Sequence, residues 1–88
     1  MKIKENYVLR QVADVWIVLP LAEATLSLNG MLKLNDSGVL LWHELEQGAD
    51  RETLAEVLIS KYAICRDQAL CDVDEFLDKL KKVGCLEG

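Results

Sequence analysis

The hydrophobic pattern of this 88-residue chain changes its period once, at Asn35. Before that residue, β-branched and aromatic residues gather in short runs, which is the composition of β-strands. After it, apolar residues recur every three or four positions, which is the spacing of amphipathic helices. A chain with this pattern places strands first and helices second, so we expect an α+β architecture.

The first two predicted strands form a hairpin. Residues 7–12 and 15–19 are rich in Val, Ile, Tyr and Trp and are separated only by Ala13-Asp14. Two such runs joined by two residues are typical of an antiparallel hairpin, although Ala-Asp is a weaker turn pair than Asn-Gly. Pro20 ends the second strand, because proline has no N–H to donate to a sheet.

A third short strand is predicted directly after Asn29-Gly30, a pair in which both residues tolerate the positive φ of a tight turn. Because side chains alternate between the two faces of a strand, Leu32 and Leu34 can face a core, whereas Met31 and Lys33 face outward.

Three helices are predicted after the strands, each with a start and a stop signal. They run from Asn35 or Asp36 to Gly48, from Asp50 to Tyr62, and from Asp67 to Gly84. We expect residues 1–88 to form a single domain in which a three-stranded antiparallel sheet is followed by a three-helix bundle. Trp42 is expected to be buried between the helices.

The three cysteines are an odd number and form no CxxC pair, so we interpret them as reduced thiols. Cys71 and Cys85 are predicted to be small buried fillers, since free cysteine packs like a hydrophobe. Cys65, beside Arg66 in a predicted loop, is the one thiol with a neighbour able to stabilise a thiolate.

The sequence shows no pattern typical of catalysis or of metal binding. His43 is the single histidine, and we expect it to be solvated on the first helix. Gly-rich phosphate loops and the nucleophile elbow are absent, and the acidic residues of the third helix are typical of a solvated face. We therefore expect no metal, no cofactor and no enzymatic activity.

Charge and hydropathy narrow the choice of partners and location. The formal net charge of -5 argues against nucleic acid as the main partner, because DNA binding depends on basic residues that neutralise phosphates. The longest apolar run, residues 15–22, is far shorter than the roughly 20 residues of a membrane span. The N-terminus also lacks the apolar stretch of a signal peptide, so we expect a cytoplasmic protein without membrane contact.

The segment from Leu34 to Trp42, Leu-Asn-Asp-Ser-Gly-Val-Leu-Leu-Trp, resembles the signature of the PqqD family, Leu-Asn-x-x-Gly/Ala-x-x-Ile/Leu-Trp. The similarity extends from about Tyr7 to Leu86. The resemblance implies a winged-helix-like domain that recognises the leader of a ribosomally made precursor peptide. The leader would add as a strand to the third β-strand, rest against the third helix and be presented to a modifying enzyme, such as a radical SAM maturase.

The candidate peptide-binding residues come from the two sides of that expected groove. They are Met31, Leu32, Lys33 and Leu34 on the strand and Asp74, Leu77, Asp78 and Lys81 on the third helix. An open strand edge offers backbone groups to a guest, and the side chains around it provide specificity. For Leu77 a plain core position is an equally good interpretation, and the charged residues can equally be solvated. A monomer or a weak homodimer is expected.

Two other functions stay open at this point. A small sheet beside three helices is also the architecture of winged-helix transcription factors, although Lys79, Lys81 and Lys82 form the only basic cluster. The other is an unrelated adaptor, or an enzyme acting through Cys65.

Overall fold

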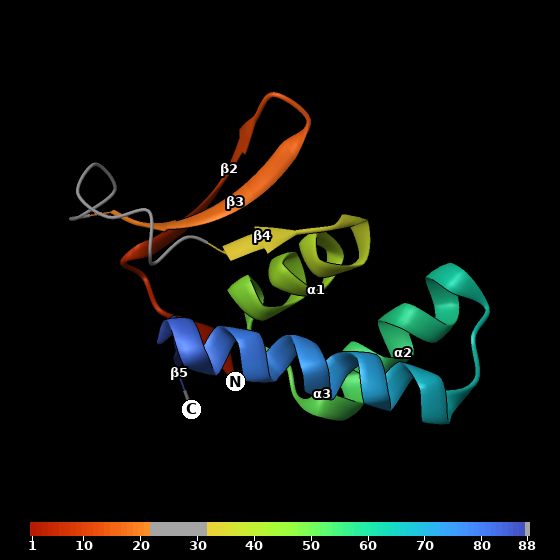
Figure 1. Cartoon of the computed structure of the whole chain (residues 1–88). Helices are drawn as coiled ribbons and strands as arrows, with labels where there is room; N and C mark the ends of the chain where they lie inside the picture. The colour runs from red at the N-terminus through yellow and green to blue at the C-terminus, as the bar shows by residue number, and fades with distance from the viewer. Residues whose placement is uncertain (22–31, 88) are drawn as a thin grey trace.

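The computed structural model describes residues 1–21 and 32–87 (Figure 1). Met31, one of the candidate binding residues, lies outside these ranges. The elements are β1 (Lys2–Ile3), β2 (Tyr7–Val12), β3 (Val15–Pro20), β4 (Leu32–Leu34), α1 (Asp36–Gln47), α2 (Arg51–Tyr62), α3 (Arg66–Val83) and β5 (Leu86–Glu87). The predicted α+β order is therefore confirmed, with two additional short strands at the ends.

The main sheet has three antiparallel strands in the order β2-β3-β4. Tyr7 is opposite Pro20 in the first pair, and Trp16 is opposite Leu34 in the second. The predicted Ala13-Asp14 turn closes the hairpin, and Ala13 takes a positive φ of 56° there. In Figure 1 this hairpin rises above the rest of the molecule, while β4 lies along α1.

A second sheet of two strands, β1 and β5, was not predicted. Lys2 is opposite Glu87 and Ile3 is opposite Leu86, so the two ends of the chain lie side by side (Figure 1). Two further backbone hydrogen bonds hold the first residues in place. Lys4 N–H donates to the Cys85 carbonyl at 2.9 Å, and the Met1 carbonyl accepts from Ala49 N–H in the loop after α1. Strands of two residues carry no periodicity, which is why the sequence did not reveal them.

The helices begin and end at the residues whose chemistry favours caps. The side chain of Asn35 accepts the N–H of Gly38 at the start of α1, and that of Asp50 accepts the N–H of Thr53 at the start of α2. Gly84 ends α3 in the left-handed conformation. α3 starts at Arg66, one residue earlier than predicted. None of the helices in the described ranges is long and apolar enough to cross a membrane.

One core joins the main sheet to the helices. Trp42 is fully buried, as expected, and is surrounded by a set of buried apolar residues that includes Val18, Leu45, Leu54, Val73 and Leu80. Cys85 belongs to this core, but Cys71 is exposed, so its predicted burial was wrong. Cys71 lies two residues before Val73, on the opposite side of α3 from the apolar stripe.

Candidate functional site: a groove between β4 and α3

β4 is an edge strand. In the described part of the chain it pairs with β3 alone, so the N–H and C=O groups along its other side have no strand partner. Such an edge is a template on which another extended segment can form hydrogen bonds. Lys33 is exposed on β4, whereas Leu34 is buried beneath the strand and Leu32 is half-buried. Among the described residues, the edge is thus open at its backbone, and its apolar side chains anchor it to the core.

A cavity of about 490 Å³ runs along this edge. Its three walls are β4, the first turn of α1 and one side of α3. The lining residues are Lys33, Leu34, Asn35, Ser37, Gly38, Leu41, Leu58, Asp72, Glu75, Phe76 and Lys79. The buried apolar members of this set provide a hydrophobic floor, and the charged members are exposed or half-exposed above it. This cavity is called the β4–α3 groove below.

The cap of α1 forms the corner of the groove. Asn35 Oδ1 accepts hydrogen bonds from Gly38 N–H and from Ser37 Oγ–H, each at 2.9 Å. Gly38 is buried where α1 touches β4, and a Cβ placed there would lie 3.2 Å from Leu34 Cβ. The small residue therefore allows the helix start to pack tightly against the strand.

The charges in the groove are not used by ion pairs. In the described residues, Lys33, Asp72, Glu75 and Lys79 have no oppositely charged partner within 4.0 Å. Asp72 accepts a hydrogen bond at 2.8 Å from the side-chain amide of Gln68, which is a neutral partner. These side chains are available to a ligand without breaking an internal pair.

On the opposite side of α3, Asp74 is already paired. Arg51 Nε and Nη2 of α2 donate to the two carboxylate oxygens of Asp74 at 2.7 and 2.9 Å. This bidentate contact holds the pKa of Asp74 below its usual value and raises the pKa of Arg51. Arg66 likewise bonds to Glu52 at 2.8 Å and to Glu56.

The predicted site residues separate into two groups. Lys33 and Leu34 line the groove, and Leu32 lies on the same strand. The α3 residues Asp74, Leu77, Asp78 and Lys81 are not among the lining residues. Leu77 is buried in the core, as its second interpretation had it. Contact of these four with a peptide stays a prediction.

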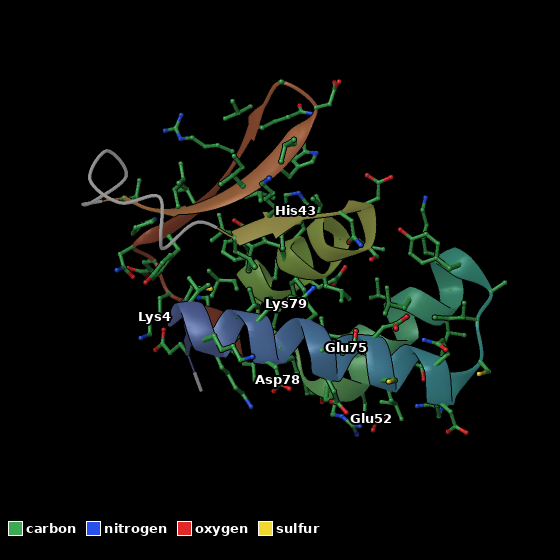
Figure 2. The ribbon with its side chains drawn as sticks, in the orientation of Figure 1. Lys4, His43, Glu52, Glu75, Asp78 and Lys79 are labelled. Carbon is green, nitrogen blue, oxygen red and sulfur yellow. The ribbon has the colours of Figure 1, made fainter. Side chains whose placement is uncertain are left out.

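The predicted and the observed lining residues of α3 differ for a simple geometric reason. Asp72, Glu75 and Lys79 follow each other at helical spacing on one flank of the apolar stripe. Asp74 and Asp78 follow at the same spacing on the other flank. Figure 2 shows Glu75 and Lys79 on the side of α3 that faces α1, and Asp78 on the opposite side. Both flanks are polar in sequence, and only the rotation of α3 relative to β4 distinguishes them.

The described residues contain no group of three His, Cys, Asp or Glu side chains placed to hold a metal ion. His43 is exposed and its Nδ1 lies 2.9 Å from Glu46 Oε1, one turn along α1. Cys65 is exposed at the N-cap of α3 and makes no side-chain capping bond.

Comparison with known proteins points to one family. The family described as coenzyme PQQ synthesis protein D (PqqD) matches residues 16–86. No curated protein matches the sequence. Two solved structures superpose over nearly the whole chain. The first, TbiB1 in complex with the TbiA(beta) leader peptide, has a TM-score of 0.78 and 27% sequence identity, and the match covers 100% of this chain and 96% of that one.

The second solved structure is a lasso peptide synthetase B1 complexed with the leader peptide. It has a TM-score of 0.75 and 21% identity, with 99% of this chain and 96% of that chain covered. At this identity the second match supports the fold.

Proposed function

This chain belongs to the PqqD family, and from that premise we propose that it binds the leader of a ribosomally made precursor peptide by adding the leader as a strand to β4. The observation that carries the proposal is the open edge of β4 beside the β4–α3 groove. Both similar structures hold leader peptides, which agrees with this use of the fold.

The geometry divides affinity and specificity between two features. Backbone hydrogen bonds along β4 would fix an extended guest regardless of its sequence, each contributing about 0.5–1.5 kcal/mol. Apolar guest side chains would enter the groove above Leu34 and Phe76, and charged ones would meet Lys33 or Lys79. Recognition of a leader therefore requires an extended segment with apolar residues on one face.

We assign no catalytic step to this chain. Its partner in the chemistry is a separate modifying enzyme, and a radical SAM maturase is the class that the PqqD resemblance implies. The role of the chain is then to hold the leader, so that the rest of the precursor reaches that enzyme.

The direct test is an NMR titration with the leader of the precursor encoded beside the gene. We expect amide shifts along Leu32–Leu34 and on α3 from Asp72 to Lys79. Shifts confined to other surfaces, or no shifts at saturating peptide, would contradict the proposal.

Strand addition has a stricter test in the peptide backbone. Alternate N–H groups of a strand point toward the neighbouring strand and away from it. Two leader peptides N-methylated at complementary sets of alternate residues should therefore bind very differently, and one set should lose most of its affinity. Equal loss from both sets would show that the peptide does not bind as a strand.

The side of α3 that contacts the peptide can be decided with three lysines. We predict that Lys79→Ala weakens peptide binding, by about two- to fivefold for one exposed charge contact. Lys82→Ala is the matched control, since Lys82 is exposed on α3 outside the groove. Lys81→Ala is the third variant, because the sequence analysis predicted that Lys81 contacts the peptide. Calorimetric titration that finds the loss with Lys81→Ala alone would move the site to the other flank.

A further inference from the structure

A second cavity continues the β4–α3 groove beyond the end of β4. It has a volume of about 420 Å³ and lies between the start of α1, the end of α2 and the start of α3. Its lining residues are Asn35, Asp36, Ser37, Leu58, Tyr62, Ile64 and Asp72. Asn35, Ser37, Leu58 and Asp72 line both cavities, so the two cavities adjoin. The second cavity is called the distal compartment.

The distal compartment differs from the groove in its charge. Among the described residues that line it, Asp36 and Asp72 are acidic and none is basic. Neither carboxylate has an ion-pair partner within 4.0 Å in the described ranges. By contrast, the groove beside β4 is lined by two lysines, Lys33 and Lys79, as well as by Asp72 and Glu75. The groove therefore holds charges of both signs, whereas the distal compartment holds carboxylates alone.

The distal compartment also offers an apolar surface beside those carboxylates. Tyr62 is 41% exposed, which is high for a large hydrophobic side chain, and Ile64, two residues later, is half-buried. Lys and Arg bury their aliphatic stems along such surfaces while their charged ends stay near water and carboxylates. A tyrosine ring face attracts cations as well.

An anionic ligand is disfavoured at the same place. The positive end of α1 is the feature that could attract one, but the Gly38 N–H there is already bonded to Asn35, and Asp36 occupies the first turn. Two unpaired carboxylates would repel a phosphate or a peptide carboxylate.

We propose that the distal compartment binds a lysine or arginine side chain of the same leader peptide, a few residues beyond the segment that pairs with β4. The cation would lie between Asp36 and Asp72, with its stem against Tyr62. This inference rests on the proposed function and adds a sequence requirement to it. It also fixes the direction in which the leader binds, because the basic residue must lie in space beyond the end of β4 that continues into α1.

The test is a selection from a displayed library of random linear peptides against the whole chain. We expect the retained peptides to carry apolar residues at alternate positions and a Lys or Arg at a fixed distance on one side of them. Selection of such peptides without any basic preference would overturn this inference but leave the proposed function standing. Retention of no peptide at all would overturn both.

Variants then connect the basic residue to the compartment. One selected peptide and its copy with norleucine in place of the lysine are titrated into wild type and into Asp36→Asn/Asp72→Asn. We expect wild type to prefer the lysine peptide by about two- to tenfold, since each exposed contact is worth about two- to fivefold at most, and the double variant to have no preference. The preference in wild type should also shrink as salt is raised, because the contact is exposed to solvent.

A control variant with the same net charge as Asp36→Asn/Asp72→Asn tests whether the preference depends only on the net charge of the protein. Asp14→Asn/Asp67→Asn removes two exposed carboxylates outside both cavities, and Asp67 lies in the first turn of α3 as Asp36 does in α1. This control should keep the wild-type preference. An equal loss in both double variants would show that the compartment is not the site of the cation.

Discussion

Gly38 fixes how closely α1 packs against β4. A Cβ at this position would lie 3.2 Å from Leu34 Cβ and 3.3 Å from Asn35 Oδ1, which is tight but needs a shift of only a few tenths of an ångström. The PqqD-like signature allows Gly or Ala here, and alanine gains up to about 1 kcal/mol of helix propensity.

We therefore predict that Gly38→Ala changes the free energy of unfolding by less than about 1 kcal/mol, since crowding and propensity oppose each other. Gly38→Val should destabilise by about 1–3 kcal/mol, because its branched methyl groups meet the backbone-fixed Leu34 Cβ. Urea unfolding of the two variants measures both values. A valine variant as stable as wild type would show that the contact is loose.

The three thiols should differ sharply in reactivity. Cys65 and Cys71 are exposed, whereas Cys85 is fully buried and burial raises its pKa to about 11. We predict that iodoacetamide labels two cysteines in the folded protein at pH 8 and the third only in denaturant. Mass spectrometry of the labelled chain counts them, with Cys85→Ala as the control that removes the slow site. Rapid labelling of all three would mean that the β5 end opens readily.

Among the elements, α2 and α3 are connected on their outer side by the Arg51–Asp74 pair. The contact depresses the pKa of Asp74, so its contribution to stability is present above the pKa of the unfolded carboxyl and is lost as the pH falls through the folded value. We predict that Asp74→Asn is less stable than wild type at neutral pH, and that this difference disappears in acid.

Urea unfolding at pH 7 and again near pH 3 would test this, with Asp67→Asn as a variant outside the pair. A difference that persists unchanged in acid would mean that the pair is not the cause. Since both side chains are exposed, the effect at neutral pH should be small.

The sequence predicted the elements well wherever their signals are local. Asn35 and Asp50 mark helix starts by side-chain chemistry, and Gly84 marks a stop. The pairing of Lys2 with Glu87 joins residues from opposite ends of the chain and has no local signal. Cys71 was misplaced because the general tendency of free cysteine to be buried was applied to it, whereas its position on α3 leaves it exposed.

For a related reason, the β4 side of the candidate site could be predicted from the sequence and the α3 side could not. The β4 side follows from strand alternation, which fixes the direction of Lys33 and Leu34 from the sequence alone. The α3 side requires knowing which polar flank faces the strand, and Asp72 and Asp74 have equal claims in sequence. The distal compartment was missed entirely, because Asp36, Tyr62 and Asp72 come from three different helices.

At the scale of the whole molecule, net charge separates peptide recognition from the winged-helix DNA-binding alternative. The chain carries a formal charge of -5, and the acidic first half of α3 precedes its basic end. We predict no retardation of duplex DNA at physiological salt, because the field of the molecule repels phosphates. Gel mobility assays over a range of salt would check this. Tight binding that weakens steeply with salt would favour the alternative.

The pairing of β1 with β5 beside the end of α3 also means that the chain can be circularly permuted. Its two ends are adjacent, so a short peptide could seal them into a ring, and new ends could be opened at the Ala13-Asp14 turn. Such a circular permutant would keep β4, α1 and α3 in their original order. We therefore expect the permutant to bind the leader as the original chain does, because binding depends on how these elements are arranged in space and not on where the chain begins.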